Sequence, residues 1–125
     1  MIYTTYLSNI KSIPDNTVKI LIMRYKPKWL YKYNDDIAWE PLLAPRMFDE
    51  YKFDNNISKQ ELFDDYYDYL ENSEIPSKVT SKIIDYIKEG KNVCFICCEK
   101  ELYDCHRRVL AEYISKKTNV EWKEL

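Results

Sequence analysis

The segment NVCFICC, at residues 92–98, constrains the fold of this chain more than any other segment. Six of its seven residues are apolar, so a strand formed there has apolar side chains on both of its faces. Such strands are typical of parallel sheets that helices cover on both sides. Because helical periodicity precedes and follows the segment, we predict an α/β fold with a small, mostly parallel sheet covered by helices on both faces.

Other strands and loops follow from the same patterns. Further strands are predicted at residues 2–6, 18–24 and 120–123, the last as a short edge strand. Residues 25–45 hold three prolines and are expected to be mostly irregular, whereas residues 46–53 are expected to form a short helix. A chain of 125 residues without internal repeats is expected to be a single domain, residues 1–125.

Three amphipathic helices are predicted between and after these strands. Ser58 and Glu61 form a capping box before the first helix, whose inward face carries Leu62, Tyr66, Tyr69 and Leu70. Pro76 suits the first turn of the second helix, and Gly90, the only glycine, suits its C-cap. Asp104 is a candidate N-cap for the third helix, whose inward face carries Val109, Leu110, Tyr113 and Ile114.

Charge is distributed unevenly along the chain. The net charge of −2 differs from the strongly basic charge of proteins that coat nucleic acids. Residues 19–33, however, contain five basic and no acidic residues, with Trp29, Tyr31 and Tyr33 among them. Basic residues interleaved with aromatic residues bind single strands by phosphate pairing and stacking. The interpretation we favour is simpler, namely that these aromatic side chains fix the loop to the core.

Nothing in the sequence predicts export or membrane insertion. The N-terminal residues lack the basic segment and long apolar stretch of a signal peptide. The longest apolar runs are too short to span a bilayer, so no membrane partner is expected. We therefore expect a cytoplasmic protein whose four cysteines are reduced thiols.

The segment CCEKELYDCHRR, at residues 97–108, concentrates reactive side chains. It contains three of the four cysteines, the only histidine and two adjacent arginines. In the predicted order it joins the carboxyl end of a central strand to the next helix, where open α/β sheets usually bind ligands. A thiol beside histidine and arginine at a helix start favours the thiolate. Cys97 and Cys105 are therefore candidate nucleophiles, and His106 is a candidate acid or base.

Positive charge at this helix start predicts a bound anion. Helix N-termini favour acidic residues, yet His106, Arg107 and Arg108 occupy the first turn. A phosphate or carboxylate bound by Arg107 would turn this repulsion into attraction. The alternative is that the arginines pair with nearby acids, namely Glu99, Glu101 or Glu112.

Other kinds of site are disfavoured by the spacing. A single glycine excludes Gly-rich phosphate loops, so no cofactor is expected, and the C-x5-R loop of cysteine phosphatases is absent. Cys94 and Cys97 have C-x-x-C spacing, but on one strand they point to opposite faces. Zinc prefers four ligands, and neighbouring residues on a strand or helix diverge. No metal is assigned, and structural zinc stays an alternative for Cys97, Cys98, Cys105 and His106.

The chain resembles the domain-of-unknown-function 488 family, including its small YeaO-like members. The strongest match is VCFICCEKELYDCHRRVLAEY, which follows the family pattern Cys-x-Glu, loop, Cys-His-Arg, helix. Weaker matches are IYTTYLSN, KPKW and LAP, in the family's order. Many members have an acid near the end of the second strand, where this chain reads IMR, ending at Arg24. The resemblance implies a compact α/β domain with a site at the strand–helix junction, and it implies no reaction.

Together these observations predict a protein that binds an anionic ligand, bearing phosphate or carboxylate, with nucleotides and nucleic acids included. The predicted pocket is built from Cys97, Glu99, Cys105, His106 and Arg107, with Arg24 and Lys28 as further ligand-binding candidates. The sequence leaves open whether a bond is broken there. The alternative is a non-catalytic interaction module in which the cluster is structural.

Overall fold

The structure, a computed structural model, describes residues 1–33, 36–45, 58–98, 100–102 and 105–125. Within these residues five strands form one sheet in the order β3-β2-β4-β1-β5, and every pairing is parallel. The strands are β1 (Ile2–Tyr6), β2 (Thr17–Leu21), β3 (Ala38–Trp39), β4 (Asn92–Cys97) and β5 (Trp122–Glu124). The predicted α/β fold is confirmed, and β4 lies at the centre of the sheet.

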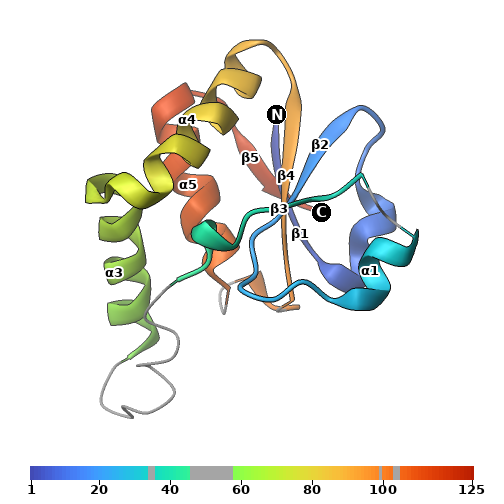
Figure 1. Cartoon of the computed structure of the whole chain (residues 1–125). Coiled ribbons are helices and arrows are strands. Elements are labelled where there is room, and N and C mark those ends of the chain that lie inside the picture. The colour runs from blue at the N-terminus through green and yellow to red at the C-terminus, as the bar shows by residue number, and fades with distance from the viewer. Residues whose placement is uncertain (34–35, 46–57, 99, 103–104) are drawn as a thin grey trace.

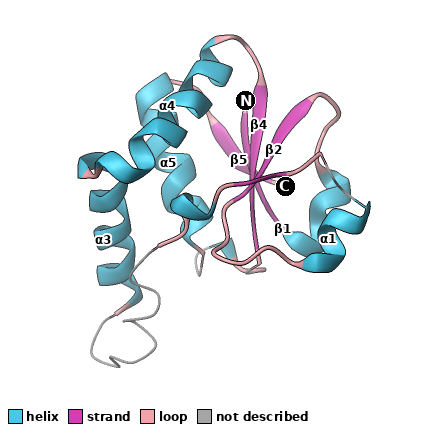
Figure 2. Ribbon diagram, viewed as in Figure 1, coloured by secondary structure: helices cyan, strands magenta, loops and turns pink. Residues whose placement is uncertain are grey.

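Helices cover both faces of this sheet, as Figure 1 and Figure 2 show. One face carries α3 (Lys59–Asn72), α4 (Glu74–Lys88) and α5 (His106–Thr118). The other carries α1 (Lys28–Tyr33) and the 3-10 helix η1 (Leu7–Ser12). A second 3-10 helix, η2, spans Pro41–Leu43. No helix in the described part of the chain is long and apolar enough to cross a bilayer.

The alternation of side chains along β4 explains why both faces are covered. Val93, Phe95 and Cys97 belong to the core beneath α3, α4 and α5. Cys94 and Ile96 belong to a second core, which they share with residues of α1 and β2. All five side chains are buried, so each face of the strand needs its own layer of helices. The prediction that Cys94 and Cys97 point to opposite faces is confirmed.

The helix signals were also read correctly. The Ser58 hydroxyl accepts a hydrogen bond from the Glu61 amide at 3.1 Å, as the capping box predicts. After α4, Gly90 has φ +86°, and the amides of Gly90 and Lys91 donate to the carbonyls of Ile87 and Tyr86. These two bonds define a Schellman motif, in which glycine avoids the steric penalty of left-handed backbone. The inward residues predicted for α3 and α5 are buried: Leu62, Tyr66, Tyr69, Leu70, Val109, Leu110, Tyr113 and Ile114.

Several expected boundaries were wrong. Residues 25–45 are not mostly irregular, because they contain α1, β3 and η2. Leu30 is completely buried, and that one apolar side chain secures α1 although prolines surround the helix. The N-cap of α5 is Cys105. Asp104 and the helix expected at residues 46–53 lie outside the described residues.

The connections between strands single out the carboxyl end of β4. The chain leaves β1 and β2 through η1 and α1, on one face of the sheet. It leaves β4 through α5, on the opposite face. Since β4 lies between β1 and β2, the connections diverge on both of its sides. Ligands of open α/β sheets bind at such switch points, here beside Cys97 and its register partner Tyr6.

The Schellman motif after α4 gives a first testable prediction. Replacing Gly90 with alanine places a Cβ in left-handed backbone, while no other atom lies within 4 Å of that Cβ. Gly90→Ala should therefore lower the free energy of unfolding by about 1 kcal/mol, through backbone strain alone. Gly90→Asn should cost less, because asparagine tolerates this conformation. Urea unfolding measures both variants, and equal costs would contradict the assignment to backbone strain.

Candidate functional site

Two thiols and the imidazole meet at the carboxyl end of β4. Cys97 ends the strand, Cys105 is the N-cap of α5, and His106 is its first residue. The ligand atoms of these three side chains lie within 4.8 Å of one another. Nδ1 of His106 is 3.8 Å from the Cys97 Sγ and 3.9 Å from the Cys105 Sγ. The three residues are 2%, 0% and 3% exposed, so the cluster lies inside the protein.

The convergence of Cys105 with His106 corrects one expectation from the sequence. Neighbouring residues were expected to diverge, as two residues within one helix do. Cys105, however, precedes the helix, and its backbone is extended, with φ −125° and ψ 141°. This conformation returns its thiol toward the imidazole. Three side chains that can bind a metal therefore come together. The spacing had indicated only two, one from the pair Cys97 and Cys98 and one from the pair Cys105 and His106.

The imidazole of His106 is held in one tautomer. Its Nε2 donates a hydrogen bond to the carbonyl oxygen of Ile22, directly after β2, at 2.7 Å. A carbonyl oxygen only accepts, so Nε2 carries the proton and Nδ1 of the neutral ring is the basic atom. Tyr66 of α3 packs edge-on against the ring, with centroids 5.4 Å apart, and its hydroxyl donates to the Leu43 carbonyl. The Cys97 sulfur lies 3.9 Å from Nε2 as well, but only Nδ1, which is near both sulfurs, can act as an acceptor or a ligand.

The two buried thiols differ in acidity. Hydrogen bonds with Cys105 and Cys98, together with burial, raise the pKa of the Cys97 thiol. Burial also raises the pKa of Cys105, but hydrogen bonds from Cys97 and the Arg107 backbone outweigh it and lower that pKa below its ordinary value. Position at a helix N-terminus acts in the same direction. Of the pair, Cys105 is the better thiolate and Cys97 keeps its proton.

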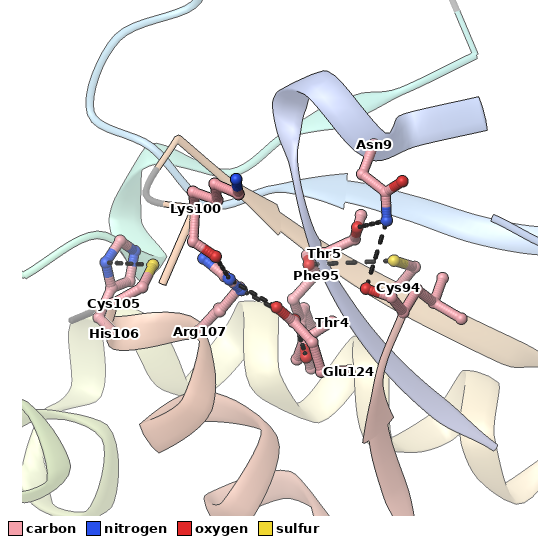
Figure 3. A network of polar contacts seen from close by, with 11 residues as sticks. Thr4, Thr5, Asn9, Cys94, Phe95, Lys100, Cys105, His106, Arg107 and Glu124 are labelled. Atoms are coloured by element: carbon pink, nitrogen blue, oxygen red, sulfur yellow. Dashed lines mark hydrogen bonds and ion pairs between the residues drawn. The ribbon is translucent and has the colours of Figure 1, made fainter. Parts of the chain in front are cut away.

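Arg107 joins this cluster to the end of β5, because its side chain hydrogen-bonds with Cys105 as well as with Glu124. Its Nε donates to Oε1 of Glu124 at 3.0 Å, and its Nη2 donates to Oε2 at 2.7 Å (Figure 3). The Lys100 carbonyl accepts a further bond from Nη2 at 3.1 Å. The guanidinium is completely buried, and this ion pair raises its pKa against the effect of burial. The anion-binding role of Arg107 stays a prediction, and an internal carboxylate already engages two of its nitrogens.

Glu124 is the partner that sequence reasoning missed. The acids considered were Glu99, Glu101 and Glu112, all close to Arg107 in the chain. A signal for Glu124 was nevertheless present, because it directly follows the predicted edge strand, and the carboxyl ends of parallel strands share one edge of the sheet. Thr4 of β1 donates to the same carboxylate at 2.7 Å, which joins the pair to the middle of the sheet.

The remaining predicted residues lie elsewhere. Arg24 lines a partly open cavity of about 180 Å³ with Pro41, Ala44 and Pro45. Lys28 is exposed at the start of α1. Cys98 is exposed, in contrast to Cys97. Glu99 lies outside the described residues, so its predicted role toward His106 or an arginine is untested.

Exposed aromatic side chains accompany Arg24 at this edge. Tyr25 is 70% exposed, Trp29 55% and Trp39 39%. The Trp39 indole donates to the Met23 carbonyl at 2.9 Å, and the Arg24 guanidinium lies 5.9 Å from the Tyr25 ring centroid. The expectation that Trp29 fixes the loop to the core was wrong, because the neighbouring Leu30 takes that position.

Fold and site together define a parallel α/β protein with a buried thiol–imidazole cluster at the carboxyl edge of its sheet. The family model described as domain of unknown function DUF488 matches residues 11–114, and the chain belongs to that family. No curated protein and no solved structure matches the chain. The matched region contains Cys97, Cys105, His106 and Arg107, whereas Glu124 lies beyond it.

The ion pair of Arg107 gives a second prediction. Arg107→Ala leaves the Glu124 carboxylate, 22% exposed, without its cation, and should lower the free energy of unfolding by about 3 kcal/mol. The matched control is Lys117→Ala, which breaks the exposed pair with Glu71 and should cost less than about 1 kcal/mol. Urea unfolding measures both. The double variant Arg107→Ala/Glu124→Ala should have a higher free energy of unfolding than Arg107→Ala alone. A double variant whose loss of free energy equals the sum of the two single losses would contradict the pairing.

Proposed function

We propose that the protein binds a nucleotide unit, free or within a single strand, at the carboxyl edge of β2 and β3. The observation that carries this proposal is the cavity lined by Arg24 between exposed aromatic side chains. A guanidinium binds phosphate through two parallel hydrogen bonds, and an exposed indole or phenol ring stacks on a base. The two features that recognise a nucleotide are therefore adjacent.

The placement of Trp39 supports this proposal. Its indole hydrogen bond to Met23 holds the ring beside the segment that carries Arg24. Tyr25 lies on the other side of that residue in the chain and contacts the guanidinium with its ring. Lys26 and Lys28 are also exposed and add positive charge nearby. A cavity of about 180 Å³ is small for a whole nucleotide, which fits a phosphate in the hollow and a base outside it.

The segments that line the cavity also contact the buried cluster. Ile22, two residues before Arg24, accepts the hydrogen bond of His106. Leu43, directly before the cavity residue Ala44, accepts that of Tyr66. The catalytic roles predicted for Cys97, Cys105 and His106 require that a substrate reach these buried side chains.

A cytoplasmic location stays part of the proposal. None of the four cysteines is in a disulfide, which is the state that a reducing compartment maintains.

Binding of a labelled single-stranded oligonucleotide, followed by fluorescence anisotropy, tests the proposal. Trp39→Ala should weaken binding roughly 5- to 150-fold, the range for loss of one stacked base. Arg24→Ala should weaken binding and reduce the dependence of log affinity on log salt by about one phosphate contact. The control is Lys88→Ala at the end of α4, which removes one exposed positive charge at the opposite edge of the sheet.

Competition identifies the form of the ligand. Displacement of the oligonucleotide by a mononucleotide at similar concentration indicates a free nucleotide, whereas displacement only by unlabelled single strands indicates nucleic acid. Equal binding by the wild type, Trp39→Ala and Arg24→Ala would overturn the site. Absence of any binding would leave the alternative of a non-catalytic interaction module as the better explanation.

A further inference from the structure

We propose that Cys97, Cys105 and His106 form a zinc site, with both Sγ atoms and Nδ1 of His106 as ligands. The inference does not depend on nucleotide binding, because it concerns the buried cluster and not the cavity. No other group of three or more potential metal ligands occurs in the described part of the chain.

The distances suit zinc. Zn–S and Zn–N bonds of about 2.3 and 2.0 Å at a tetrahedral angle place sulfur and nitrogen about 3.5 Å apart. The observed separations between Nδ1 and the two sulfurs are 3.8 and 3.9 Å. Each sulfur–nitrogen pair is therefore within about 0.4 Å of the separation that zinc requires. Because Cys105 precedes the helix and His106 begins it, the adjacent pair meets Cys97 without distortion of α5.

The surroundings of His106 also suit a metal ligand. A metal-binding histidine usually donates its second ring N–H to a carbonyl or carboxylate, which orients the ring. Here Nε2 donates to the Ile22 carbonyl at 2.7 Å, so Nδ1 is the nitrogen that can take a metal, and both sulfurs lie within 3.9 Å of it. Tyr66 packs edge-on against the same ring. The imidazole is thus oriented for coordination before any ion arrives.

Charge balance favours a divalent ion that prefers sulfur. Metal binding removes the thiol protons, and two thiolates in a site no more than 3% exposed need a compensating positive charge. A Zn²⁺ ion with two thiolates has no net charge, and binding releases the thiol protons to solvent. Calcium and magnesium prefer oxygen ligands and do not fit this set.

The number of ligands indicates the kind of zinc site. The described residues supply three ligands, whereas structural zinc is almost always held by four protein side chains. Sites with three protein ligands keep the fourth position for water or a substrate oxygen. With the three ligands that the described residues supply, the fourth position takes water or a small oxygen donor.

Metal content and cobalt substitution test this inference. Protein purified under reducing conditions should take up one zinc per chain, measured by elemental analysis. After mild chelation, Co²⁺ should produce thiolate-to-cobalt charge-transfer absorption in the wild type. Cys97→Ser, Cys105→Ser and His106→Gln should each weaken metal binding by roughly 100-fold or more, beyond the 10- to 100-fold typical of outer partners.

Two other cysteines provide matched controls. Cys94 is equally buried but lies on the opposite face of β4, and Cys98 is exposed. Cys94→Ser should retain one metal per chain, and Cys98→Ser should also retain it, with affinity reduced by no more than the 10- to 100-fold of an outer partner, because Cys98 hydrogen-bonds with Cys97. Because the wild type is tested with and without metal, the result does not depend on whether a variant folds. Absence of metal uptake by the folded, reduced wild type, or a Cys97–Cys105 disulfide in freshly purified protein, would overturn the zinc site, while nucleotide binding would be unaffected.

Discussion

The hydrogen bond from His106 Nε2 to the Ile22 carbonyl is the interaction on which the site depends. It joins the first residue of α5 to the end of β2, across 84 residues of sequence. It determines which imidazole nitrogen carries the proton and therefore which one faces the thiols. It also holds the segment that continues to Arg24 and the cavity. This one bond thus sets the tautomer of His106 and fixes the backbone at Ile22, two residues before Arg24 of the cavity.

The three residues of the Cys-His-Arg motif have three different partners. Cys105 returns toward Cys97 at the end of β4, His106 reaches the end of β2, and Arg107 reaches Glu124 in β5. In the sheet order β3-β2-β4-β1-β5, these contacts span four neighbouring strands. The start of α5 is therefore anchored on both sides of the β1–β4 switch point. A motif that the sequence presents as one pocket is, in three dimensions, a thiol–imidazole cluster that Arg107 links to the carboxylate of Glu124.

What the sequence could predict was set by periodicity and by local chemistry. The apolar run of β4 predicted a sheet covered on both faces, and Gly90 predicted a left-handed C-cap, because both signals act within a few residues. The approach of the Cys105 thiol to His106 was not predictable. It depends on α5 beginning at His106 and not one residue earlier, and sequence patterns do not place a helix start that accurately. The pairing of Arg107 with Glu124 depends on strand order, which brings β5 beside β1. Spacing along the chain carries no information on that contact.

The burial of the cluster decides between the kinds of chemistry that its residues allow. A thiolate nucleophile must reach its substrate, and Cys105 is completely buried. A metal ligand needs no such exposure, because an ion and one water fit where a larger substrate does not. Arg107, which hydrogen-bonds with Cys105, has its positive charge balanced by the internal carboxylate of Glu124. A compact divalent ion therefore matches the buried cluster, whereas a phosphate-sized anion matches the exposed cavity at Arg24.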